Sequence, residues 1–136
     1  MVIADAKTAL RRHLVNAFPN IDIAVEGIPF DAQHGTYLAV QFVIRNPIEP
    51  TYGPYYYRED IQMHIFVSDR LGIGTTNAEN IADQIREVFY KGLTIVEGNY
   101  RIQILRRAHL QSAVVTSDRL VVPISLPFQV EVYRNS

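Results

Sequence analysis

Apolar residues at helical spacing mark two segments of the chain. In residues 2–18 the apolar positions share one face of a helix, and Pro19 marks the end of that helix. A second helix should run from about residue 77 to residue 91, because Gly92 then stands where a glycine often follows the last turn. The apolar positions are Ile3, Ala6, Leu10, Leu14, Ala17 and Phe18 in the first segment and Ala78, Ile81, Ala82, Ile85, Val88 and Phe89 in the second. The pattern therefore predicts two amphipathic helices, each with one face available for packing.

Alternation of apolar and polar residues marks the strands. The alternating segments are 21–26, 37–45, 57–67, 101–110 and 120–133. The second and third of them should form a hairpin with a long connection. Pro123 and Pro127 fall on one face of the last segment, and proline has no N–H group to donate to a neighbouring strand. At least part of this last strand should therefore lie at an edge or a bulge.

Helices and strands that each have one apolar face suggest a layered fold. We expect an α+β protein, a two-layer sandwich in which a mixed or antiparallel sheet of about four to six strands carries two helices packed on one face. The other face of the sheet should carry the polar residues Gln41, Arg45, Arg58, Asp60, Gln62 and His64. A length of 136 residues, with no repeat and no low-complexity tract, suits a single domain over residues 1–136.

Charge and composition limit the kinds of partner that the chain can bind. The sequence has 13 Lys and Arg against 14 Asp and Glu, a formal net charge of −1, whereas charge-driven binding to nucleic acid or to an anionic membrane needs a basic excess. Without cysteine the chain can form neither disulfides nor thiolate metal sites. No signal peptide is recognisable, and no apolar run approaches the ~18 residues of a membrane-spanning helix. We expect no nucleic-acid sequence recognition, no membrane partner and folding in a cytosolic environment.

The stretch RLGIGTTNAENIADQIREVF, residues 70–89, raises the question of a phosphate-binding loop. A dinucleotide-binding fingerprint needs a third glycine where Asn77 stands, and a Walker loop needs a lysine that is absent. Thr76 and Glu79 instead match a capping box, in which each side chain accepts a hydrogen bond from the backbone N–H of the other. We interpret the stretch as a glycine turn followed by a helix, and we keep anion binding at residues 72–76 as an alternative.

No catalytic, cofactor-binding or metal-binding residues can be assigned from the sequence. The histidines do not show the spacing of zinc ligands; they are His13, His34, His64 and His109. Glu59 and Asp60 are neighbours on a strand and point to opposite faces, so they cannot form a carboxylate pair. The same argument separates Arg106 from Arg107. Because no serine stands in a nucleophile motif either, we expect no enzyme, no cofactor and no metal.

The segment NPIEPTYGPYYY, residues 46–57, has an unusual composition, with three prolines and four tyrosines. The prolines limit backbone freedom, and tyrosine offers a large amphipathic contact area. The segment is either a surface loop whose tyrosines pack back on the body or a protruding contact arm in an assembly. The sequence leaves both interpretations open.

The order of these elements resembles that of a family of bacteriophage proteins. The resemblance rests on four stretches: AKTALRRHLVNAFPNIDIAVEGIPF, TYLAVQFV, IQMHIFVSDRLGIGTTNAENIADQIREVF and DRLVVPISLPFQVEVY. On these stretches the chain is similar to the lambda-type tail terminator proteins of long, non-contractile-tailed bacteriophages, a minor tail protein group with tail-completion roles. The stretches cover most of the chain, but no part of residues 46–57 belongs to them.

The resemblance implies a structural virion protein without a catalytic site and with a mixed sheet that carries two helices on one face. Such proteins form a ring, typically a hexamer, on the head-proximal end of the tail tube, stop tube polymerisation and present the surface to which the head attaches. The implied partners are further copies of the chain, the tail tube protein and a head-completion or neck protein. The implied location is the virion tail, after assembly in the host cytoplasm. The alternatives are a neck or head-completion protein of a phage or prophage and a small anion- or nucleotide-binding domain.

Overall fold

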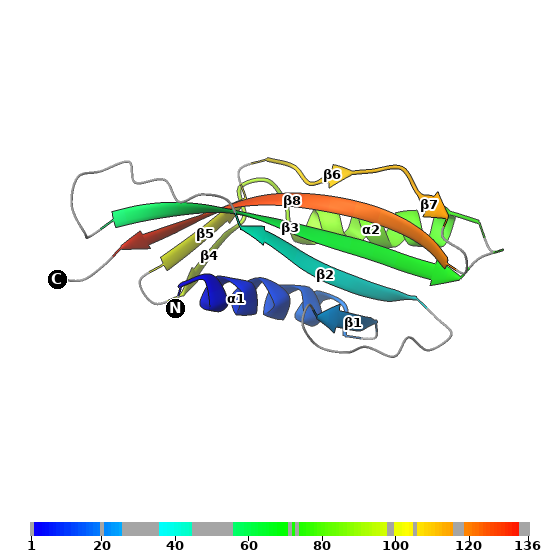
Figure 1. The fold of residues 1–136 in the computed structure, drawn as a ribbon, viewed down its shortest axis with the longest axis horizontal. Helices are drawn as coiled ribbons and strands as arrows, with labels where there is room; N and C mark the ends of the chain where they lie inside the picture. The colour runs from blue at the N-terminus through cyan, green and yellow to red at the C-terminus, as the bar shows by residue number, and fades with distance from the viewer. Residues whose placement is uncertain are drawn as a thin grey trace.

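The computed structural model describes residues 2–19, 21–25, 36–44, 56–70, 72, 74–97, 100–104, 106–115 and 119–133. Two helices and eight strands are found in this part of the chain (Figure 1). Their order is α1 (Val2–Ala17), β1 (Asp22–Val25), β2 (Tyr37–Ile44), β3 (Tyr56–Arg70), α2 (Thr76–Val88), β4 (Thr94–Glu97), β5 (Tyr100–Ile104), β6 (His109–Leu110), β7 (Val114–Val115) and β8 (Arg119–Tyr133). The predicted helices and the five predicted strand regions are therefore present.

All eight strands belong to one sheet. The strand order is β1-β2-β3-β8-β5-β4, and β6 and β7 also pair with β8. β1 is parallel to β2, whereas the other pairs are antiparallel. The two longest strands, β3 and β8, lie in the middle, and Figure 1 shows how strongly they curve past the helices. The sheet is therefore a curled half-barrel rather than a flat layer.

The predicted two-layer sandwich with four to six strands is wrong. The sheet has eight strands and curls, and the helices are not a second layer stacked on one flat face. Buried residues from both helices and from the curved sheet form a single hydrophobic cluster. β4 and β7 have only four and two residues, too few for a readable alternation. The curl arises from twist that accumulates along strands of 15 residues, and the residue pattern does not report it.

Alternation along β3 and β8 builds the centre of this core. The register aligns Met63 with Leu126 and Ile65 with Ile124, and all four side chains are fully buried. Helical residues that complete the cluster are Ala6, Ala9, Leu10, Leu14, Ala78, Ala82 and Ile85. Among the described side chains the predicted apolar helix faces are therefore correct, except that Ala17 is exposed; the side chain of Ile3 lies outside the described residues.

The end of α2 differs from the prediction. The helix ends at Val88, because Phe89 leaves the helix and its fully buried ring packs edge-on against Phe128, with ring centroids 6.0 Å apart. Residues 90–93 form a turn in which the last N–H group donates to the first carbonyl oxygen at 3.0 Å. Gly92, with φ +94°, is the third residue of this turn. Gly92 therefore belongs to the turn that leads into β4, and it does not cap α2.

β8 pairs on both sides, but only one side is continuous. On the β3 side the partners run without a break from Tyr56↔Tyr133 to Arg70↔Arg119. On the other side pairing stops between β5 and β6, where the five steps from Ile104 to His109 lie opposite three steps along β8. Pairing stops again between β6 and β7, where the four steps from Leu110 to Val114 lie opposite three. The strand predicted over residues 101–110 is therefore broken by two extra residues, which form a bulge.

The prolines of β8 explain which side is interrupted. The carbonyl oxygen of Pro123 accepts the Gln111 N–H at 3.0 Å, so the carbonyl oxygens and N–H groups of the odd-numbered residues of β8 point toward β6. Pro127 lies four positions further along and has the same direction. The missing N–H groups therefore fall on the interrupted side, and the β3 ladder does not need them. The expected bulge is present, but β8 is an interior strand and the extra residues belong to its partners.

Candidate assembly surfaces

The four histidines do not converge. His13 lies between the helices, where its Nε2 is 3.1 Å from the carbonyl oxygen of Val88. His64 lies on β3, with Nδ1 3.1 Å from Ser125 Oγ, and His109 is exposed on β6. His34 lies outside the described residues. In the described part of the chain no three His, Asp or Glu residues gather in a way that could hold a metal ion.

The start of α2 is built differently from the predicted capping box. The residue before the helix is Thr75, not Thr76, and its side chain makes no capping hydrogen bond. The Glu79 N–H donates instead to the Thr75 carbonyl oxygen at 2.9 Å. The predicted glycine turn is present, since Gly72 and Gly74 have φ of +89° and +80°, a region that favours glycine. The capping box is therefore wrong, whereas the glycine turn is correct.

A buried carboxylate holds the start of α2 to the sheet. Asp69, at the end of β3, is 1% exposed and accepts a hydrogen bond from the Asn77 side-chain amide at 2.9 Å. Its other carboxylate oxygen accepts from the Thr36 hydroxyl at 2.9 Å and from the Arg70 N–H at 2.8 Å. Asn77, which stands where a dinucleotide-binding fingerprint would need its third glycine, thus has a structural role. Sequence reasoning missed this network; its only signal is an Asp at a strand end followed by a glycine turn and an Asn.

The protonation state of Asp69 bears on anion binding. Burial raises the pKa of Asp69, whereas the hydrogen bond from Asn77 lowers it. The Arg70 N–H, the Thr36 hydroxyl and the positive charge of Arg119 also lower the pKa, which ends below its ordinary value of 3.8. The carboxylate is therefore ionised beside the N-terminus of α2. A negative charge at this position disfavours a bound phosphate.

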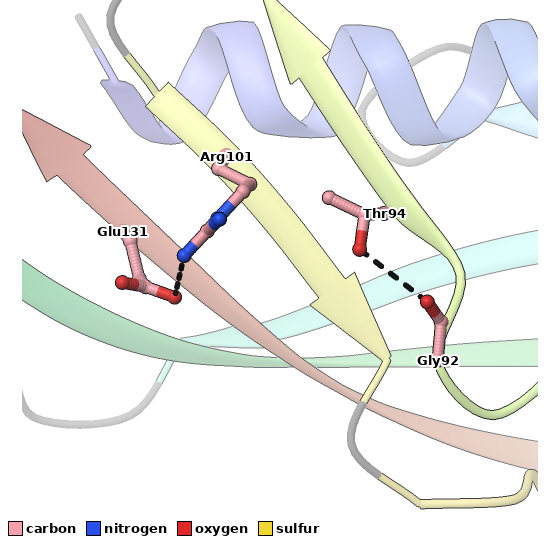
Figure 2. A network of polar contacts seen from close by, with 4 residues as sticks. All are labelled: Gly92, Thr94, Arg101 and Glu131. Carbon is pink, nitrogen blue, oxygen red and sulfur yellow. Dashed lines mark hydrogen bonds and ion pairs between the residues drawn. The ribbon is translucent and has the colours of Figure 1, made fainter.

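The predicted polar residues that the structure describes lie on the sheet face opposite the core, together with the apolar Val43 and Phe66. Gln41 is exposed, and Asp60, Gln62 and His64 are partly buried; the side chains of Arg45 and Arg58 lie outside the described residues. Figure 2 shows Arg101 on β5 donating to the Glu131 carboxylate on β8 at 3.2 Å, and Thr94 donating to the Gly92 carbonyl oxygen at 3.3 Å. These bonds join neighbouring strands and turns, so they stabilise the fold.

A groove of about 400 Å³ lies between the end of α1 and the second half of α2. We call it the α1/α2 groove, and its lining residues are Ala17, Phe18, Asp83, Gln84, Glu87 and Val88. The contact of His13 with the Val88 carbonyl oxygen joins the two helices beside the groove. The His13 ring also packs against Phe89, with centroids 5.1 Å apart. The groove therefore has an apolar lining from Ala17, Phe18 and Val88 and carries carboxylates on the α2 side.

The bulge between β5 and β6 carries two exposed arginines. Arg106 and Arg107 were expected on opposite faces of a strand, but they lie in the bulge and both are exposed. The next residue, Ala108, is 3% exposed and belongs to the core. We call residues 106–107 the arginine bulge. Its buried neighbour anchors it to the body of the protein.

Several large apolar side chains are exposed. They are Val15, Val43, Tyr90, Val96, Val114 and Val115. Scattered apolar residues are normal on a protein surface, but two of these are adjacent and form β7, on the interrupted side of β8. The proline- and tyrosine-rich segment lies outside the described residues, except for the backbone of residues 56–57 at the start of β3. Within the described residues no helix has the length and hydropathy that crossing a membrane requires.

Comparison with known proteins identifies the family. A family model described as phage tail terminator protein matches residues 5–128. Eleven chains of solved structures are also similar. One of them, whose name states no function, is 21% identical with a TM-score of 0.78 and covers 99% of each chain, which shows a shared fold. No curated protein gives a match.

The chain therefore belongs to the phage tail terminator family. This confirms the resemblance found in the sequence. Members of the family are structural proteins of the virion tail that interact with other phage components. The relevant chemistry is thus that of contact surfaces, and the α1/α2 groove, the arginine bulge and the exposed valines of β7 are the candidates that the described residues offer.

Proposed function

We propose that this chain caps the head-proximal end of a phage tail tube as a ring, terminates tube polymerisation and forms the interface to which the head attaches. Membership of the phage tail terminator family over residues 5–128 is the observation that carries the proposal. The chain would act as one domain and without catalysis, cofactor or metal. Its partners would be further copies of itself, the tail tube protein and a head-completion protein.

The described surfaces support a role in assembly. A ring requires two different surfaces on each subunit that fit each other and close by rotation. The α1/α2 groove and the arginine bulge differ in shape and in sign of charge, as such a pair must. The ionised Asp69 at the start of α2 disfavours the alternative of a phosphate-binding domain. The geometry therefore favours broad protein contacts over a small-molecule site.

The proposal predicts the phenotype of a phage that lacks this chain. Electron microscopy of its tails should show tubes longer than wild type, because nothing stops polymerisation, and supplying the chain in trans should restore the length. Tails of wild-type length in the deletion would contradict the proposal. Wild-type tails together with leaking heads would instead indicate a neck protein.

A further inference from the structure

One side of α2 presents regularly spaced carboxylates. Glu79, Asp83 and Glu87 lie four residues apart and are all exposed. Like charges at this spacing repel each other and destabilise a helix. Asp83 is partly balanced by Arg86 at 3.4 Å, whereas Glu87 makes no ion pair with the described residues. The groove thus presents negative charge that the subunit itself does not fully balance.

The arginine bulge carries the complementary charge. Within the described part of the chain, neither Arg106 nor Arg107 makes an ion pair or a hydrogen bond. An arginine combines an aliphatic stem with a planar cation that pairs well with carboxylates. The stem suits the apolar lining of the α1/α2 groove, and the cation suits Asp83 and Glu87.

We propose that the α1/α2 groove of one subunit receives the arginine bulge of a second copy of this chain. The proposal rests on the proposed ring, for which it names the contact between subunits. Guanidinium groups of Arg106 and Arg107 would lie along Asp83 and Glu87, and their stems would cover Ala17. Desolvating these charges together makes the contact specific for this partner.

The groove and the bulge are two different patches of the subunit, so a contact between them is head-to-tail. α2 supplies four of the six lining residues and ends in a turn whose Gly92 N–H donates to the Ile104 carbonyl oxygen at 2.8 Å, two residues before the bulge, whereas α1 leads into β1 at one end of the strand order (Figure 1). Each copy can therefore offer its groove to one neighbour and its bulge to another. Such a contact repeats from subunit to subunit and closes into a ring when the rotation allows.

Cross-linking through introduced cysteines tests the contact, because the chain has no cysteine of its own. Glu87→Cys and Arg107→Cys chains are mixed and treated with a short bismaleimide, both as purified protein and within assembled tails. We expect a cross-linked dimer at a yield roughly tenfold above that of Glu87→Cys with Arg70→Cys, because proximity raises the effective concentration. Arg70 is a matched control, being an exposed cation at the end of β3 that belongs to neither surface.

A Glu87→Cys/Arg107→Cys chain extends the test. Head-to-tail contacts should give a ladder of cross-linked species that stops at the size of the ring. Equal yields for the Arg107 and Arg70 pairs, in solution and in tails, would overturn the contact. If the deletion still gives overlong tails in that case, the proposed function stands and only the contact is wrong.

Exchanging the charges gives a second, independent measurement. Glu87→Arg and Arg107→Glu should each weaken self-association by roughly tenfold, as measured by sedimentation velocity. Mixing the two variants in equal amounts should restore association, because each variant then offers the charge that the other lacks. Both positions are exposed, so thermal melting should show folded protein in each case. A mixture that associates no better than the single variants would contradict the contact.

Discussion

The two sides of β8 differ in how they pair. On one side β3 follows β8 residue by residue over its whole length, and on the other β5, β6 and β7 pair in three short pieces. The even-numbered residues of β8 from 120 to 130 are buried and apolar, whereas Pro123 and Pro127 are odd-numbered. β8 thus has continuous pairing on one side and interrupted pairing on the other, because its two prolines stand at odd-numbered positions, whose missing N–H groups would face the interrupted side.

Both sides of β8 contribute to the core, since Ile102 and Ile104 of β5 are also buried, but the broken side has exposed candidate contact residues as well. The intact side aligns fully buried residues from neighbouring strands, and the core depends on it. The broken side exposes the arginine bulge and the valines of β7. An interrupted edge also offers fewer backbone groups for unspecific strand pairing. We infer that side-chain contacts, rather than strand addition, determine assembly on this side.

The largest effect is expected on the intact side. Leu126→Ala removes a fully buried side chain that is aligned with Met63 and should lower the free energy of unfolding by about 2–5 kcal/mol. Val115→Ala, at a residue 67% exposed on the broken side, is the control and should change it by less than about 0.5 kcal/mol. Urea unfolding measures both. Equal losses would contradict the assignment of Leu126 to the core and of Val115 to the surface.

The network at the end of β3 should have the next largest effect. Asp69→Asn removes a buried charge that accepts three hydrogen bonds, and it should lower the free energy of unfolding at neutral pH by about 1.5–3 kcal/mol. The exposed Asp83→Asn is the matched control.

The same network should make stability depend on pH. Because folding lowers the pKa of Asp69, its contribution is present above the ordinary value of 3.8 and is lost as pH falls through the lowered pKa. This part of the pH dependence should be missing from Asp69→Asn. An unchanged acid-unfolding curve in the variant would show that the Asp69 carboxylate does not stabilise the end of β3.

Two neighbouring residues at the start of α2 sharpen this test. Asn77→Ala loses the bond to Asp69 and should lower the free energy of unfolding by about 1 kcal/mol. Thr76→Ala should change it by less than about 0.5 kcal/mol, because Thr76 is exposed and is not the capping residue. Thermal unfolding of the two variants side by side distinguishes them. A larger loss of unfolding free energy for Thr76→Ala than for Asn77→Ala would show that Thr76 caps the helix, as the capping box predicted.

The smallest effect is expected at the interruption itself. Pro127→Val restores an N–H group that points toward the bulge, where no aligned partner stands, and should change stability by less than about 0.5 kcal/mol. A gain above roughly 1 kcal/mol, a typical net value for a new hydrogen bond, would show that the proline alone keeps the bulge open.

The sequence predicts local elements well here and their arrangement poorly. Periodicity located both helices and the buried faces of β3 and β8, because each of these elements has one long apolar face. It could not locate β4 and β7, which are too short, or the curl of the sheet, which depends on twist summed over many residues. The prolines indicated a bulge but not which strand would contain it.

The candidate surfaces were harder to predict than the fold. The spacing of Glu79, Asp83 and Glu87 is readable, but the groove forms only when the end of α1 meets α2. Arg106 and Arg107 read as part of a strand, and the register of β5 and β6 against β8 shows that they do not belong to one. Asp69 and Asn77 are eight residues apart and meet because the glycine turn reverses the chain. Each site thus depends on contacts between distant elements.

Tail length in a phage that carries Arg106→Glu/Arg107→Glu tests most directly whether the broken side of β8 serves assembly. We expect the purified variant to unfold at the wild-type temperature, because both side chains are exposed, and the phage to make overlong tails. A variant that folds normally and still gives tails of wild-type length would contradict this role for the arginine bulge.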